Sequence, residues 1–173
     1  MSIIDEGISG NRLLHDGRGP SLLSRLDRDV LSQSGVRYLI VLIGINDIGR
    51  ATRARDPADP VSVADLAWGL SQVAERAHEK GVSVYAATLT PAGHGSPSGE
   101  ALRSGLNDWI RASTLFDGVI DFDAMVKDPQ HPTRMLPPFD SGDSLHPGDE
   151  GYSKMGNSID LSWFVTRHQS RQE

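Results

Sequence analysis

The run Val36-Arg-Tyr-Leu-Ile-Val-Leu-Ile43 is followed directly by Gly44-Ile-Asn-Asp47. The eight residues 36–43 are almost continuously apolar and rich in β-branched side chains, a pattern typical of a strand that is covered on both faces. Strands of this kind occur in parallel sheets, because the connecting helices pack on both sides. The sequence therefore predicts a buried parallel strand that ends at Gly44 and opens into a polar loop over residues 44–49.

Helical and strand patterns alternate on either side of this run. Apolar spacing predicts helices over about residues 20–34, 62–80 and 100–113 and from Pro147 onward, and short apolar runs predict strands over 82–89 and 118–122. Ile3 and Ile4, followed by acids and glycine, are interpreted as the end of a further strand, whereas residues 123–145 are expected to be irregular. Alternating strands and helices predict a parallel sheet between two layers of helices.

Length and composition exclude several classes of protein. The chain has 173 residues, 38% hydrophobic and 23% charged, which fits one globular domain over residues 1–165 with a polar tail over 166–173. It contains no cysteine, so disulfides, thiolate metal sites and a cysteine nucleophile are excluded. A net charge of −6 argues against nucleic-acid binding, and no apolar run is long enough for a membrane span.

The beginning of the chain carries no pattern of a targeting segment. Residues 1–7 have neither a basic region nor an apolar stretch of the length found in signal peptides. If this start is the native one, the sequence predicts a cytoplasmic location, and otherwise it leaves the compartment undetermined.

Three polar segments follow predicted strands and should meet at one edge of the sheet, where α/β proteins bind ligands. The most informative is Asp143-Ser-Leu-His146. A carboxylate that accepts Nδ1–H from a histidine fixes its tautomer and leaves Nε2 as a base. The same spacing also arises when an aspartate caps a helix beside a surface histidine. A metal site formed by His131, Asp143 and His146 is a further alternative, although no repeated ligand spacing supports it.

The other two segments offer hydrogen-bond donors. Asn46 would present its side-chain amide at the mouth of the sheet, and Gly10 would present a backbone N–H group. Donors of this kind stabilise an oxyanion during acyl transfer. Each segment, taken alone, is also typical of an ordinary turn, because Asn, Asp and Gly favour turns.

Taken together, Gly10, Gly44-Ile-Asn46-Asp47 and Asp143-Ser-Leu-His146 resemble three of the four sequence blocks of the SGNH hydrolases, also called GDSL-type esterases and lipases. The resemblance implies a three-layer α/β/α fold with a mostly parallel, flavodoxin-like sheet. It also implies that the protein hydrolyses acyl or acetyl esters, including acetylated sugars, without a cofactor or metal. His146 would then be the general base and acid, Asp143 would orient it, and Asn46 and Gly10 would be oxyanion donors. Asp47 would tie neighbouring loops together.

The chain departs from the family pattern at the first block, Gly-Asp-Ser, which carries the nucleophile. The only such triplet is Gly142-Asp143-Ser144, whose aspartate already belongs to the Asp-x-x-His block. The sequence is therefore interpreted as N-terminally truncated, without the family's first strand and helix. Ser9 is the serine nearest the expected oxyanion site. It is interpreted either as a replacement nucleophile or as a simple turn residue.

A missing strand would leave an apolar strand edge open, and open edges recruit partners. A homodimer or a domain-swapped oligomer is therefore expected. The alternative to an ester hydrolase is a non-catalytic member of the family that acts as a ligand-binding or oligomerising domain.

Overall fold

A computed structural model describes residues 2–52, 58–93 and 95–164. Its centre is a parallel sheet of three strands, β1 (Tyr38–Val41), β2 (Ser83–Ala87) and β3 (Gly118–Ile120), in the order β1-β2-β3. In this register Tyr38 lies opposite Ser83, and Tyr85 lies opposite Gly118. The mixed α/β fold with a parallel sheet is as predicted.

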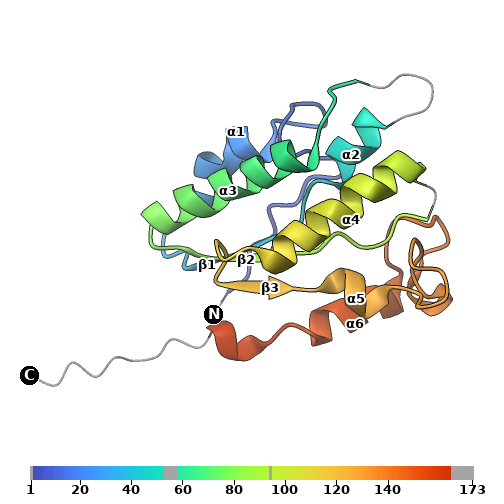
Figure 1. Ribbon diagram of the computed structural model, residues 1–173. Coiled ribbons are helices and arrows are strands. Elements are labelled where there is room, and N and C mark those ends of the chain that lie inside the picture. The colour runs from blue at the N-terminus through green and yellow to red at the C-terminus, as the bar shows by residue number, and fades with distance from the viewer. Residues whose placement is uncertain (1, 53–57, 94, 165–173) are drawn as a thin grey trace, which may run out of the picture.

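Helices cover both faces of the sheet (Figure 1). On one face lie α1 (Leu22–Leu26), which a wider helical turn continues over Asp27–Leu31, α3 (Val63–Glu79) and α4 (Pro97–Ala112). On the other face lie α5 (Phe122–Val126), α6 (Asp149–Asn157) and a final short turn, Leu161–Phe164. Successive strand residues point to opposite faces, so Val84 packs in the first core and Tyr85 in the second.

Local sequence signals account for the helix ends. Ser62 and Asp65 form a capping box at the start of α3, since each side chain accepts a hydrogen bond from the other residue's backbone N–H. Beyond the end of α3, Gly81 has a φ of +71°, a left-handed conformation that glycine adopts without strain. The chain then returns directly into β2, as the sequence predicts.

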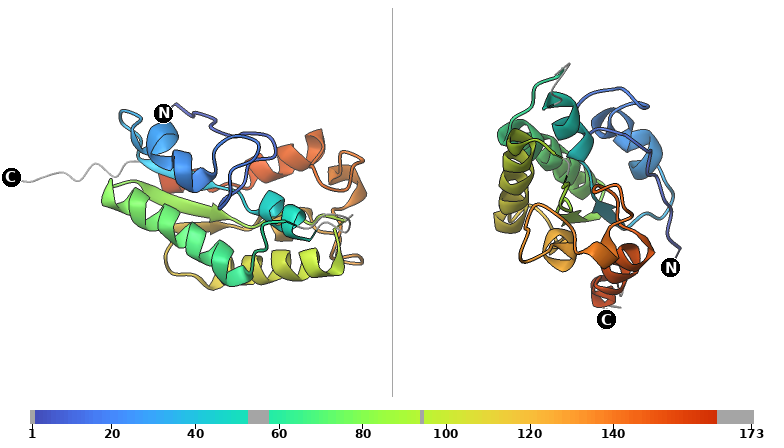
Figure 2. Two further views of the ribbon diagram at one scale, coloured as in Figure 1. Left: turned by 90° about the horizontal axis from the view of Figure 1, so that it is seen from above. Right: turned by 90° about the vertical axis from the view of Figure 1, so that its right-hand side faces the viewer.

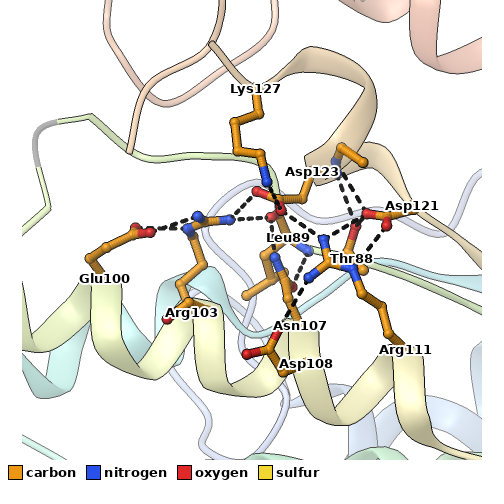
Figure 3. A network of polar contacts seen from close by, with 12 residues as sticks. Thr88, Leu89, Glu100, Arg103, Asn107, Asp108, Arg111, Asp121, Asp123 and Lys127 are labelled. Carbon is orange, nitrogen blue, oxygen red and sulfur yellow. Dashed lines mark hydrogen bonds and ion pairs between the residues drawn. The ribbon is translucent and has the colours of Figure 1, made fainter. Parts of the chain in front are cut away.

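A buried polar network fixes the carboxyl ends of β2 and β3 to α4 (Figure 3). The guanidinium of Arg103 lies 2.7 Å from the carboxylate of Asp123, and both side chains are only 4% exposed. Arg103 also donates to the carbonyl of Leu89 at 2.7 Å and pairs with Glu100 through two hydrogen bonds. Asn107 both donates to and accepts from the Leu89 backbone. Both the N–H and the carbonyl of Leu89 are therefore hydrogen-bonded, and these contacts fix the chain where it leaves β2.

Three expectations from the sequence are wrong in detail. Residues 2–8 contain no strand, and Ile3 is 89% exposed, because this segment has no neighbouring strand to pair with. One face of the β1 segment is only partly covered, since Ile40 is 42% and Leu42 45% exposed. The predicted loop after Gly44 is instead a helix, α2 (Ile45–Ala51), with Gly44 at a φ of +121° before it.

The long stretch after β3 is also more regular than expected. It contains α5 and a short 3₁₀ turn, Pro137–Phe139, and the chain between them makes the bridge Lys127–Met135. Asp121 caps α5 by accepting the N–H of Ala124. The remainder, residues 140–146, is an irregular turn before the final helix.

The buried ion pair of Arg103 yields a first prediction. Arg103→Ala removes two hydrogen bonds to Glu100, one to Leu89 and the pairing with Asp123. Removing one partner of a buried pair typically costs about 3–5 kcal/mol, and Arg111 and Lys127 still neutralise Asp123, so we expect a loss near 3 kcal/mol in urea unfolding. The matched control is Arg28→Ala, an exposed arginine paired with Asp29, whose urea midpoint should scarcely move. Equal losses in the two variants would contradict the assigned role.

Asp121 yields a second prediction, on pH. Burial raises the pKa of its carboxyl, but hydrogen bonds from Arg111, Ala124 and Thr88 outweigh burial and lower the pKa to about 2. The unfolded chain has the ordinary, higher pKa, so the carboxylate stabilises the fold above about pH 4, and this contribution is lost as the pH falls towards 2.

Urea midpoints measured across this pH window should therefore fall less in Asp121→Asn than in the wild type. Asp108→Asn removes an exposed carboxylate that contacts the same Arg111 and should retain the full pH dependence. An unchanged acid dependence in Asp121→Asn would refute the assignment.

Candidate active site

The Asp143–His146 pair lies in the irregular turn before α6. Asp143 Oδ2 is 2.6 Å from His146 Nδ1, and Oδ1 accepts the backbone N–H groups of Leu145 and His146 at 2.9 and 2.8 Å. The hydrogen bond from the His146 ring and these backbone contacts hold the pKa of Asp143 well below its usual range. An ionised carboxylate only accepts hydrogen bonds, so Nδ1 carries the proton. Within the described residues Nε2 has no partner, and its lone pair can therefore act as a base.

Hydrogen bonds to its backbone N–H groups fix the turn that carries this pair. Asp140 Oδ1 accepts the N–H groups of Gly142 and Ser144, and the N–H of Ser141 donates to the carbonyl of His146 at 3.0 Å. Ser144 has a φ of +60°, and its carbonyl accepts the N–H of Gly93 at 2.8 Å. The last contact joins the turn to the chain that follows β2.

Asn46 and Asp47 lie in the first turn of α2 and bind the N-terminal segment. The side-chain amide of Asn46 donates to the carbonyl of Asn11 at 3.0 Å. Asp47 is 1% exposed and accepts the backbone N–H groups of Leu13 and Leu14 at 2.8 and 3.0 Å. Burial raises the pKa of Asp47, and these N–H donors oppose that rise. The expected role of Asp47 in tying loops together is confirmed.

Gly10 lies beside this contact, because Asn11 is its neighbour in the chain. Its φ is +75°, and a Cβ atom at this position would lie 2.6 Å from Cδ of Arg18, so only glycine fits without displacing that side chain. The N–H of Gly10 makes no hydrogen bond within the described part of the chain. An amide side chain has two N–H donors, so Asn46 retains one beyond its bond to Asn11. Gly10 and Asn46 therefore each have one N–H donor without a partner in the described part of the chain.

Two cavities meet at Asn46. The larger measures about 850 Å³, and the smaller about 110 Å³. Asn46, Gly49, Thr52 and Gly95 line both of them. The residues that line only the larger cleft include Gly10, Arg12, Arg18, Arg50 and Ser96. Those that line only the smaller cavity include Ile48, Ala92, Glu100, Arg103 and Leu145. A group bound at Asn46 would therefore have one large and one small space beside it.

The structure brings the predicted residues to one end of the molecule, but not all into one cavity. Figure 1 shows α2 and the turn before α6 at the same end, and the right-hand view of Figure 2 faces that end. Gly10 and Asn46 line the large cleft together. His146 lines neither cavity, although its neighbour Leu145 lines the smaller one, and the His146 side chain is 62% exposed.

Ser9 and His131, which the sequence offers only as alternatives, line neither cavity. Ser96, which sequence reasoning missed, instead lines the large cleft. The Ser-Pro pair at 96–97 indicates a helix cap, and Ser96 Oγ indeed accepts the N–H of Gly99, but only the fold shows that it faces a cleft. His131 pairs with Asp128 at 3.0 Å, and residues 2–52, 58–93 and 95–164 hold no group of three potential metal ligands.

Comparisons with known proteins agree with this fold. A GDSL-like lipase from Bacteroides thetaiotaomicron superposes with a TM-score of 0.68 at 20% sequence identity, covering 88% of this chain and 71% of that one. An acetylxylan esterase from Geobacillus stearothermophilus superposes with a TM-score of 0.68 at 17% identity, covering 94% and 72%. No curated protein matches the sequence. None of the described helices is both long and apolar enough to cross a membrane.

The sequence itself matches one family model, described as the GDSL-like lipase/acylhydrolase family, over residues 1–154. This match covers most of the chain, including β1 to β3, the segment of Gly10 and Asn46, and the Asp143–His146 turn. The chain therefore belongs to the GDSL-like lipase/acylhydrolase family.

Proposed function

We propose that this protein is an ester hydrolase that acts on short acyl esters, acetyl esters and acetylated sugars among them. The observation that carries the proposal is the 2.6 Å contact between Asp143 and His146, which leaves Nε2 as an available base. Gly10 and Asn46, which both line the large cleft and each have an N–H donor to offer, support it. These four residues are the proposed catalytic set.

In the proposed reaction, Gly10 and Asn46 bind the ester and His146 acts as the base. The ester carbonyl accepts hydrogen bonds from Gly10 and Asn46, which stabilise the negative charge that forms on this oxygen. His146 Nε2 takes a proton from the attacking hydroxyl group, and later gives it to the departing alcohol. Asp143 holds the ring and stabilises its protonated form.

The attacking group is either water or a serine. The only serine that lines the large cleft within the described residues is Ser96, whose hydroxyl already caps α4. We therefore propose water as the attacking group: its oxygen bonds to the carbonyl carbon as its proton passes to Nε2, and the bond to the alcohol then breaks. Direct attack forgoes a covalent intermediate and should be slow.

The smaller cavity favours a short acyl group. Its volume of about 110 Å³ is far below that of the large cleft, about 850 Å³, so we assign the acyl group to the smaller cavity and the alcohol portion to the cleft. Acetyl and propionyl groups are the acyl groups that we expect to fit best. The paired side chains of Glu100 and Arg103 form part of the wall and are held by the buried network, so the cavity does not extend easily.

Hydrolysis of p-nitrophenyl esters tests the proposed function. The wild type should hydrolyse the acetate faster than it hydrolyses the octanoate, and faster than the acetate hydrolyses in buffer alone. His146→Ala should lower the rate by about 100-fold or more. Where the wild-type rate exceeds the rate in buffer by less than this factor, the variant should fall to the rate in buffer. His78→Ala is the matched control, because His78 forms a similar pair with Asp117 at 2.9 Å outside both cavities. A rate that survives His146→Ala, or that never exceeds buffer, contradicts the proposal.

Labelling by a fluorophosphonate, followed by mass spectrometry, separates the two attacking groups. With water as the attacking group, no serine is labelled stoichiometrically and Ser96→Ala retains the hydrolysis rate. Labelling of Ser96, together with loss of activity in Ser96→Ala, would replace the water mechanism by a covalent one.

A second candidate function, oligomerisation without catalysis, is favoured by one observation. In the β1 segment at the sheet edge, Ile40 and Leu42 are 42% and 45% exposed and lie on the same side of the chain. Open apolar edges pair readily with another chain. We propose that two copies of this protein associate through this edge, as a homodimer or a domain-swapped oligomer.

Light scattering tests this association. The wild type should have the mass of a dimer or larger species, and Ile40→Lys combined with Leu42→Lys should shift it to the monomer, since charged side chains on an edge oppose pairing. Trp68→Lys replaces a more exposed apolar side chain, on α3, and should leave the mass unchanged. A monomeric wild type would contradict the proposed interface, and so would a monomer produced equally by Trp68→Lys.

A further inference from the structure

The large cleft has a charge opposite to that of the whole protein. The chain carries 23 acidic residues against 17 lysines and arginines, but the described residues that line this cleft include three arginines, Arg12, Arg18 and Arg50, and no acidic residue. A concave surface of one sign concentrates ligands of the opposite sign. The cleft is therefore suited to an anion, although the net charge of the chain is −6.

Two of the three arginines already have partners. Arg12 Nη1 lies 2.7 Å from Asp59 Oδ2, and Arg12 Nη2 donates to the carbonyl of Asp16. The hydrogen bond from Arg12 lowers the pKa of Asp59, so this carboxylate stays charged and neutralises Arg12. Arg50 also has an interaction partner of its own. Neither side chain is free to provide the main contact with a ligand.

Arg18 differs from them in one respect. Its guanidinium has no hydrogen bond or ion pair with any residue in the described ranges 2–52, 58–93 and 95–164. Its backbone is fixed, because the Arg18 carbonyl accepts the side-chain amide of Asn11 at 3.0 Å, and the same amide also binds the carbonyl of Pro20. Arg18 therefore lines the cleft from a fixed backbone position, and its guanidinium has five N–H donors.

The stem of Arg18 lies directly over Gly10. A Cβ atom on Gly10 would be 2.6 Å from Cδ and 3.3 Å from Nε of Arg18, so the missing side chain of Gly10 makes the space that the arginine occupies. Gly10 also supplies one of the two N–H donors proposed to bind the ester carbonyl. A group bound by Arg18 would therefore lie next to the reacting carbonyl, on the side of the large cleft.

We propose that Arg18 binds a carboxylate or phosphate group on the alcohol portion of the substrate. The guanidinium matches both anions through paired hydrogen bonds. The smaller cavity is the less suitable place for an anion, because Arg103 there is already bound to Glu100 and Asp123. The assignment to the alcohol portion of an ester depends on the proposed hydrolase function, whereas the anion site itself does not.

Calorimetric titration tests the site without any catalytic step. The probes are glucuronate, glucose 6-phosphate and neutral glucose, each added to the wild-type protein. At least one anionic sugar should bind more tightly than glucose, with an affinity that falls as salt is raised. Arg18→Gln should weaken this binding about tenfold, and Arg18→Lys should retain part of it. Arg28→Gln removes the same charge from an exposed arginine outside the cleft and should leave binding unchanged.

The outcomes separate this proposal from the hydrolase function. Glucose binding as tightly as both anionic sugars, or equal binding by wild type and Arg18→Gln, would overturn the anion site. An equal loss in Arg28→Gln would also overturn it, since the effect would then follow from net charge alone. Arg18-dependent binding without ester hydrolysis would support the anion site while the hydrolase function fails. Circular dichroism of each variant verifies that the fold is retained.

Discussion

The buried carboxylate of Asp47 holds the candidate site together. It is 1% exposed, and its two oxygens accept the backbone N–H groups of Leu13 and Leu14. A carboxylate buried without partners would be strongly unfavourable, so these contacts are required once α2 has placed Asp47 in the interior. They hold the segment that follows Gly10 against α2, and Asn46 adds a third contact through the Asn11 carbonyl. The neighbouring positions of the two proposed oxyanion donors depend on this arrangement.

Buried polar side chains also hold backbone groups in place at the ends of β2 and β3. Leu89 is bound on both its N–H and its carbonyl by Asn107, and its carbonyl also accepts from Arg103. Gly93 then donates to Ser144 in the turn that carries Asp143 and His146. Polar contacts outside the sheet, made by side chains and by backbone groups, therefore set the positions of the loops. The hydrophobic cores lie beneath this edge, on the two faces of the sheet, and the site rests on their rigid strands.

The sequence predicts the features that depend on local patterns. The apolar run of β1 and the capping box of Ser62 are of this kind, since each depends on neighbours within a few residues. The spacing of Asp143 and His146 also predicts their contact, because three residues of turn suffice to bring them together. Four letters, Gly-Ile-Asn-Asp, are as typical of a turn as of a helix start, and only packing of the buried Asp47 and Ile48 decides for α2.

Features that depend on distant parts of the chain were missed, because local patterns carry no information on them. Ile3 and Ile4 have the composition of a strand, but a strand needs a partner, and the segment has none in the described sheet. Ser96 and Arg18 enter one cleft only because α4 and the segment after Gly10 fold to the same end of the molecule.

Gly10 connects the two properties of the cleft. Its positive φ turns the chain so that its N–H remains unbonded, and its lack of a side chain leaves room for the stem of Arg18. One residue type thus satisfies a backbone requirement and a packing requirement at the same position. Because the guanidinium lies close to this N–H, its positive charge also adds to the field that an oxyanion bound there would experience. The proposed anion recognition and the proposed stabilisation of the reacting carbonyl would therefore be physically coupled at Gly10, and a substitution there would alter both.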